Sequence, residues 1–65
     1  MNFGGNLKEF RLKRGKSTKE LSEELGYGES QYIEWETGTS EPNYVQLAAL
    51  AIYFECSADS LLGLN

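Results

Sequence analysis

The chain has 65 residues, enough for one small domain, and carries 10 acidic and 6 basic residues for a net charge of −4. It has one cysteine, Cys56, and no histidine, which excludes an intrachain disulfide and a structural zinc site. The longest apolar run, residues 47–54, is far shorter than the ~18 residues of a membrane span, and no signal sequence is visible, so we expect a cytoplasmic protein with no membrane partner.

The charges are unevenly distributed along the chain. All six basic residues lie between positions 8 and 19 with a single acid, Glu9, which gives this window a charge of +5. Residues 20–65 hold nine acids and no base, a charge of −9. This pattern fits either a local anion-binding segment on an acidic body or a solvated basic helix end.

Short polar breaks divide the chain into five segments, and no alternating apolar run argues for a strand. In the first segment Phe3, Leu7 and Phe10 recur at helical spacing, and Gly15 follows its end. Short helices joined by short loops predict an all-α bundle.

The second segment opens at Ser17, and Glu20 three residues later predicts a capping box. Leu21 and Leu25 supply its core face, and Gly26 ends it. The third segment covers residues 28–37. It places two aromatic residues on one core-facing side, and Gly38 follows it. These aromatic residues are Tyr32 and Trp35.

The fourth segment follows a second expected capping box, formed by Asn43 and Gln46, and Ser57 is expected to cap a short fifth helix. The fourth helix carries more apolar surface than one core needs. Its inner stripe is expected to contain Tyr44, Leu47, Leu50, Ala51 and Phe54. Its second stripe contains Val45, Ala48, Ala49 and Ile52. The second stripe indicates a homodimer interface, unless its alanines are merely harmless exposed residues.

Three sequence pieces in order carry a family resemblance. They are STKELSEELG at 17–26, WETGTSEP at 35–42 and LAALAIYFECSADSLLG at 47–63. Over residues 3–64 the chain resembles the Cro and phage-repressor-like helix-turn-helix family. The resemblance implies a compact five-helix bundle of the lambda-repressor-like type, a single domain over residues 1–65. It also implies operator DNA as partner, usually bound by a dimer with its two reading helices about 34 Å apart.

The resemblance implies which residues meet DNA. Base-edge positions map onto Glu29, Ser30 and Glu34, with Ile33 nearby. The usual residues there are Gln, Arg and Ser. A carboxylate can still accept from cytosine N4, serine suits either base type, and an apolar group can meet a thymine methyl. The alternative role of Glu29 is a favourable interaction with the positive end of the helix macrodipole. The alternative for Glu34 is a solvated helix residue without a base contact.

Phosphate contacts map onto Ser17, Thr18, Thr39 and Ser40 by the same resemblance. The cations around the start of the second helix are expected to supply positive charge, or else only to solubilise the domain. These cations are Lys13, Arg14, Lys16 and Lys19. The resemblance also implies an Arg11–Glu36 ion pair behind the reading helix. Cys56 is expected to be a buried, unreactive thiol.

The sequence therefore predicts a sequence-specific DNA-binding transcriptional regulator of the repressor-like kind. It would place helix 28–37 in the major groove and be anchored by the basic segment 13–19. The alternative is a helix-turn-helix fold used as a protein-binding module with an acidic interaction face. Without histidine, a glycine-rich phosphate loop or a spaced carboxylate pair, we expect no enzyme, no cofactor or metal, and no small-molecule substrate.

Overall fold

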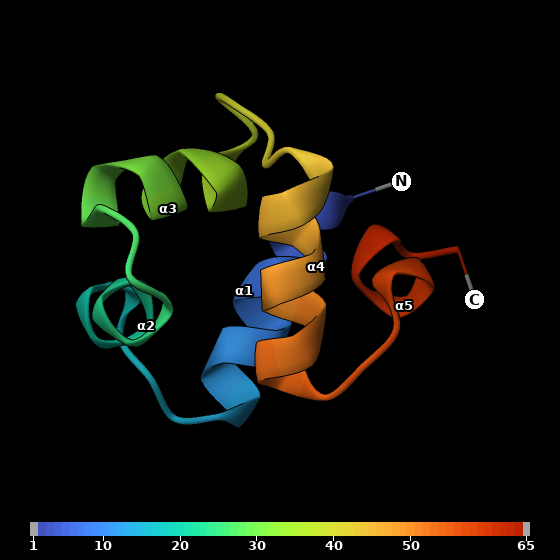
Figure 1. The fold of residues 1–65 in the computed structure, drawn as a ribbon, viewed down its shortest axis with the longest axis horizontal. Helices are drawn as coiled ribbons and strands as arrows, with labels where there is room; N and C mark the ends of the chain where they lie inside the picture. The colour runs from blue at the N-terminus through green and yellow to red at the C-terminus, as the bar shows by residue number, and fades with distance from the viewer. Residues whose placement is uncertain (1, 65) are drawn as a thin grey trace.

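Five helices make up the computed structural model, which describes residues 2–64 (Figure 1). They are α1 (Phe3–Lys13), α2 (Thr18–Leu25), α3 (Glu29–Thr37), α4 (Tyr44–Phe54) and α5 (Ala58–Leu62). No strand occurs in the described range. The predicted all-α, five-helix architecture is confirmed. Even α4, the most apolar helix, has only 11 residues, and no helix among residues 2–64 could cross a membrane.

Side-chain caps define where four of the helices begin. The cap of α1, where the N–H of Gly5 donates to Asn2 Oδ1 at 2.9 Å, was not predicted from the sequence, whereas the other three were. In the capping box of α2, the backbone N–H of Ser17 donates to Glu20 Oε1 at 2.9 Å, and that of Glu20 donates to Ser17 Oγ at 3.0 Å. Asn43 and Gln46 form the same reciprocal pair at α4, at 2.9 and 2.8 Å. Ser57 caps α5. These bonds satisfy N–H groups that have no partner inside their own helix.

Helices α2, α3 and α5 end at glycines in the left-handed conformation. Helix α4 instead ends at Glu55, whose φ of 55° makes it the only non-glycine residue with positive φ in the described chain. Left-handed backbone is costly for a residue with a Cβ. The sequence contains no signal for this ending.

A core of seven buried residues joins all five helices: Leu7, Leu21, Tyr32, Trp35, Leu50, Phe54 and Leu61. One expectation for α4 was wrong, because Tyr44 is 84% exposed and not part of the inner stripe. It lies about 70° around the helix from the centre of the buried arc. It is also the first residue of α4, where the chain arrives from a loop.

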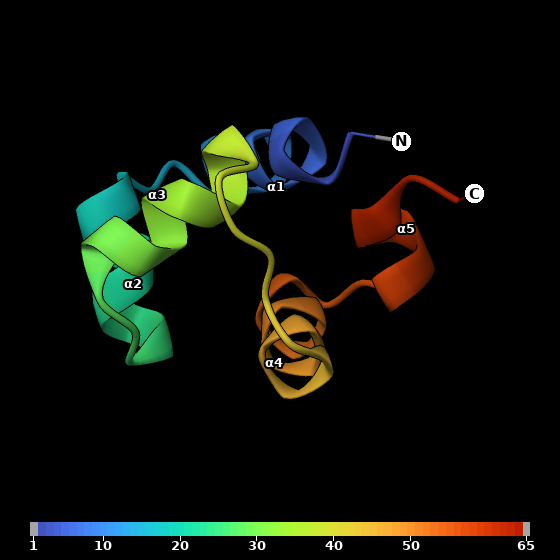
Figure 2. The same cartoon turned by 90° about the horizontal axis from the view of Figure 1, so that it is seen from above.

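Helix α1 packs against both α3 and α5, and α2 packs against α3 and α4 (Figures 1 and 2). Gly4 lets the first turn of α1 approach the end of α3 closely. A Cβ placed at Gly4 would collide with the backbone carbonyl of Glu36. The position of α3, which carries the candidate reading surface, is therefore fixed partly by a backbone-to-backbone contact.

Candidate nucleic-acid interface

A three-residue turn joins the end of α2 to the start of α3. It folds α3 back so that the first residues of the two helices lie close together. Gly26 adopts a φ of 83° at the end of α2, and the N–H of Tyr27 donates to the carbonyl of Ser22 at 3.0 Å. Gly28 then leads into α3 without a side-chain cap. This helix–turn–helix unit presents α3 on the surface, with α2 beneath it in Figure 1.

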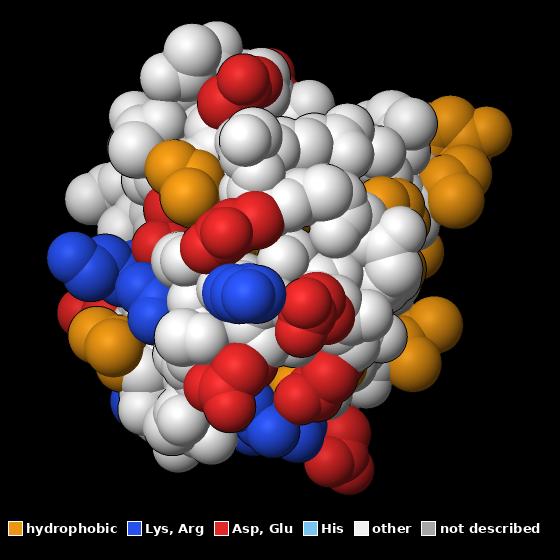
Figure 3. All heavy atoms as spheres, turned by 90° about the vertical axis from the view of Figure 1, so that its left-hand side faces the viewer, with side chains coloured by type: hydrophobic (Ala, Val, Ile, Leu, Met, Phe, Trp, Pro, Cys, Tyr) orange, Lys and Arg blue, Asp and Glu red, His pale blue; other side chains and the backbone are white. Residues whose placement is uncertain are grey.

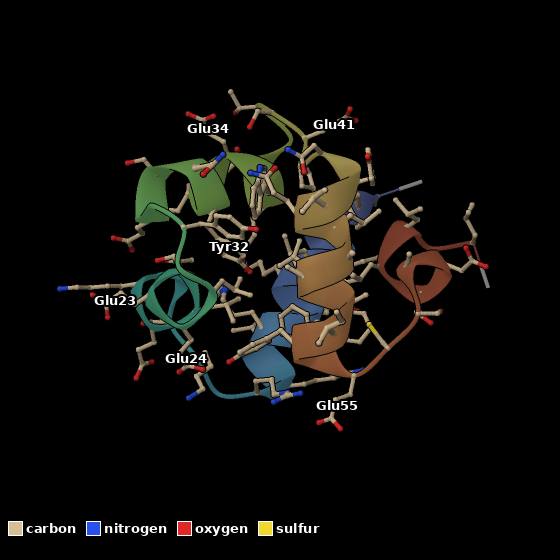
Figure 4. The ribbon with its side chains drawn as sticks, in the orientation of Figure 1. Glu23, Glu24, Tyr32, Glu34, Glu41 and Glu55 are labelled. Carbon is tan, nitrogen blue, oxygen red and sulfur yellow. The ribbon has the colours of Figure 1, made fainter. Side chains whose placement is uncertain are left out.

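The two sides of α3 differ sharply in exposure. Tyr32 and Trp35 are 0% and 1% exposed, and they pack edge-to-face with ring centroids 6.0 Å apart. All four base-contact candidates are exposed on the other side: Glu29, Ser30, Ile33 and Glu34. Figure 4 shows Tyr32 directed into the molecule while Glu34 points away from it. The structure thus brings the candidate reading residues onto one accessible surface.

Behind α3, Arg11 and Glu36 form a two-pronged ion pair. Arg11 Nε donates to Glu36 Oε2 at 2.7 Å and Nη2 donates to Oε1 at 3.2 Å. The side chains are only 11% and 9% exposed. Arg11 Nη1 also donates to the carbonyl of Lys16 at 2.9 Å, and the hydrogen bonds that Arg11 donates to Glu36 raise the pKa of the guanidinium. One side chain therefore joins α1, α3 and the loop before α2.

The Tyr32 hydroxyl belongs to the same buried region, which sequence reasoning did not show. It is buried and has no hydrogen-bond partner among the described residues. Burial raises the pKa of Tyr32, and the nearby Glu36 carboxylate raises it further. The phenol therefore stays neutral, and the charge of this cluster resides on Arg11 and Glu36.

A hydrogen bond ties the start of α2 to the start of α3. Thr18 Oγ1 donates to Glu29 Oε2 at 2.8 Å. Both residues were expected to face DNA, Thr18 toward phosphate and Glu29 toward bases. The bond gives Glu29 a role within the protein. Each is the first residue of its helix, and that shared position is the only sequence signal for the contact.

The basic segment does not gather as one cluster at the start of α2. Arg14 donates to the carbonyl of Tyr53 at 2.6 Å, and its guanidinium lies 5.1 Å from the centre of the Tyr53 ring. It also contacts the Glu55 carboxylate at 3.4 Å. Arg14 is therefore held at the end of α4, a contact with a residue 39 positions away that the sequence did not indicate.

The other cations of the segment differ in their surroundings. Lys16 Nζ forms an ion pair with Glu24 Oε2 at 2.8 Å, and the hydrogen bond to Glu24 raises the pKa of the lysine. Glu24 also accepts from the Tyr53 hydroxyl at 2.6 Å. Lys13 lies 5.9 Å from the centre of the Phe10 ring. Lys19 is exposed, as is Lys13.

The loop after α3 offers hydroxyl groups rather than backbone donors. The N–H groups of Thr39 and Ser40 both donate to the carbonyl of Glu34, at 3.0 and 3.3 Å. The hydroxyls of Thr37 and Thr39 lie 2.9 Å apart. An anion near this loop would therefore meet the side chains of Thr39 and Ser40.

Comparison with known families agrees with this geometry. A family model described as helix-turn-helix matches residues 7–61. The chain belongs to this helix-turn-helix family, of the Cro/C1 type. Its members are DNA-binding regulators, and the all-helical architecture is that of the lambda-repressor-like fold. No curated protein and no solved structure gives a significant match to the chain.

The helix-turn-helix face of this member is acidic. Figure 3 looks at the side formed by α2 and α3, where Asp and Glu side chains spread over the surface, and Lys and Arg side chains lie at its left margin, near its centre and toward its lower edge. Helix α3 has three glutamates and no base. Two of these are explained within the fold, because Glu36 pairs with Arg11 and Glu29 accepts from Thr18. Glu34 is the acid that faces outward without such a contact.

Cys56 is partly buried against the core rather than fully enclosed. Burial raises the pKa of its thiol, which disfavours the reactive thiolate. No group of three or more potential metal ligands occurs among residues 2–64.

Proposed function

We propose that this helix-turn-helix protein regulates transcription by binding duplex DNA in a sequence-specific manner with α3 in the major groove. The observation that carries the proposal is the division of α3. Its inner side is locked by Tyr32, Trp35 and the Arg11–Glu36 pair, so its outer side can be presented in a fixed orientation. Rigid presentation of base-reading side chains is what major-groove recognition requires.

The outer side of α3 supports a particular kind of readout. Ser30 can donate to or accept from a base edge, Ile33 can contact a thymine methyl, and the Glu34 carboxylate can accept from cytosine N4. We therefore expect pyrimidines on the strand nearest the second turn of α3. Glu29 is assigned to holding the start of α3, because Thr18 already donates to it.

Anchoring to phosphates would rest on the start of α2. The capping box uses the N–H groups of Ser17 and Glu20, whereas those of Thr18 and Lys19 have no bond within the described chain. Free N–H groups at a helix start attract phosphate, and the exposed ammonium of Lys19 adds charge beside them. Arg14 and Lys16 already have acidic partners. We therefore expect few phosphate contacts and a shallow salt dependence, with a slope of about −0.9 per contacted phosphate.

The test begins by selecting preferred sequences from a random duplex library, followed by titration of the selected duplex at several salt concentrations. Lys19→Gln is expected to weaken binding to all duplexes alike and to reduce the salt slope by about one. Lys8→Gln removes the same charge from outside the segment 13–19 and serves as the matched control. Glu34→Gln is expected to change the preferred base at one position. A failure to bind any duplex at low salt would contradict the proposal.

A second candidate function is recognition of a basic protein partner by the acidic face. The observation that favours it is the pairing of Arg14 with Glu55 and of Lys16 with Glu24, which removes two cations from DNA anchoring. The low-salt titration separates the two candidates. Binding of a lysine-rich peptide, weakened by Glu34→Gln and unaffected by duplex, would support the protein-binding function instead.

A further inference from the structure

A cleft open to solvent lies where α1 and α4 begin and α3 and α5 end. Its volume is about 360 Å³, in the lower part of the range of small-molecule binding sites. Residues of these four helices and of the loop 38–42 line it. Because the lining combines both ends of the chain with its middle, no local pattern in the sequence indicates the cleft.

Most of the side chains that line the cleft are apolar. Phe3, Leu47 and Leu62 are half-buried, so each presents part of its surface to solvent. Trp35 and Pro42 complete the apolar part of the lining. Small-molecule sites in proteins are typically lined by apolar and aromatic side chains, with a few polar groups that fix the orientation of the ligand. The cleft therefore suits the apolar or aromatic part of a small molecule.

A single carboxylate sets the charge of the cleft. Glu41 is the only charged residue among the described residues that line it. It is exposed, forms no ion pair within residues 2–64, and lies where the loop meets the start of α4 (Figure 4). Helix ends of both polarities surround the cleft, since two helices begin there and two end there, so their macrodipoles largely offset one another. The cleft therefore favours a ligand with one positive charge.

Contacts within the protein hold the walls of the cleft in place. Gly4 packs directly on the backbone carbonyl of Glu36, which fixes the start of α1 against the end of α3. The N–H of Ser40 donates to the carbonyl of Glu34 at 3.3 Å, which ties the loop to α3. The capping box described above fixes the first turn of α4. A preformed site loses less conformational entropy when a ligand binds, which favours binding.

We propose that this cleft binds a small aromatic amine, with the ring against the apolar lining and the ammonium group beside Glu41. The ring matches Phe3, Leu47 and Leu62, and the ammonium group matches the one carboxylate of the lining. An anionic ligand would meet that carboxylate with no cation in the lining to offset it. An uncharged aromatic ligand would gain the apolar contacts alone.

The cleft is separate from the outer side of α4, where the sequence predicts a homodimer interface. Val45, Ala48 and Ile52 of that second stripe are exposed, whereas Ala49 is half-buried. None of these four residues lines the cleft. The homodimer stays a prediction, and the proposed ligand site does not depend on it.

Amide NMR of the full chain tests the site without DNA, so its failure is distinct from a failure of the proposed function. Phenethylamine, a cation at neutral pH, is titrated at low salt, with neutral phenethyl alcohol and anionic hydrocinnamate as matched probes. A ligand of this size in an open cleft is expected to bind in the millimolar range. The signals of Gly4, Gly38 and the Trp35 indole should shift, and the amine should bind most tightly and the anion most weakly. No saturable shift at the cleft, or equal binding of the three probes, would overturn the proposal.

Two pairs of variants test the two parts of the site. Glu41→Gln is expected to weaken binding of the amine about two- to fivefold and to leave the alcohol unchanged, whereas Glu34→Gln, which removes an exposed charge outside the cleft, should change neither. Leu62→Ala should weaken the amine and the alcohol alike, at least about threefold, and Leu64→Ala, at a 62% exposed position outside the cleft, is its control. Circular dichroism verifies that each variant remains folded. Equal effects within either pair would overturn the proposal.

Discussion

Replacing Arg11 by Met, Glu36 by Met, and both together gives a sharp test of how α3 is held. Loss of Glu36 leaves the Arg11 guanidinium with one acceptor, the carbonyl of Lys16, in a site that is 11% exposed. Loss of Arg11 leaves a carboxylate that is 9% exposed, with the nearby phenol of Tyr32 as a potential donor. Removing one partner of a buried ion pair typically costs about 3–5 kcal/mol.

The magnitude is large for a domain of this size. At roughly 0.05–0.15 kcal/mol per residue, a chain of this length has a total stability of only about 3–10 kcal/mol. The double variant buries no unpaired charge, so we expect it to lose less than the sum of the two single losses, with a coupling of about 2 kcal/mol or more. Urea unfolding followed by the fluorescence of the single, buried Trp35 measures all four proteins. Glu36→Gln provides a milder change if a Met variant does not fold.

The exposed Lys16–Glu24 pair supplies the matched control. Its side chains are 33% and 42% exposed, so solvent screens the pair and the same double-mutant cycle should give a much smaller coupling than the Arg11–Glu36 cycle. Equal coupling in the two cycles, or additive losses for Arg11 and Glu36, would refute the reasoning that burial makes the inner pair important.

Two further predictions concern stability. Gly4→Ala should destabilise the protein by about 1–3 kcal/mol because its Cβ collides with the Glu36 carbonyl. Gly28→Ala is the control and should change the melting temperature little, because Gly28 has open space around it and a φ of −69°. Equal melting temperatures for the two variants would contradict the close approach of Gly4 to α3. The hydrogen bond from Lys16 lowers the pKa of Glu24, so this carboxylate stabilises the fold above its unfolded pKa, near 4.5, and loses that contribution as the pH falls through its lower folded value. Glu24→Gln should therefore flatten the acid side of the stability–pH curve, and an unchanged acid limb would contradict the pairing.

The features that sequence predicted well depend on residues close together in the chain. The capping boxes at Ser17 and Asn43 need only a partner three positions away, and both form as expected. Tyr32 and Trp35 share one side of a short helix, so periodicity alone places them in the core. The Arg11–Glu36 contact joins distant residues and became visible only through family resemblance.

The features that sequence missed depend on how helices meet in space. The contact of Arg14 with the Tyr53 carbonyl and the bond from Thr18 to Glu29 both need the relative positions of two helices, which local spacing does not specify. Tyr44 fits the inner periodicity of α4, yet it is the first residue of the helix and remains exposed. Periodicity indicates direction around a helix, but coverage depends on the neighbouring elements.

The two-sided character of α3 also has a bearing on mutational tolerance. Tyr32, Trp35 and Glu36 hold the helix, whereas Ser30 and Ile33 lie outside every buried contact of the core. Substitutions at the outer positions should therefore leave the folding free energy almost unchanged. A lineage, or a designer, could exchange the outer residues one at a time and pass through a series of folded proteins with different preferred targets.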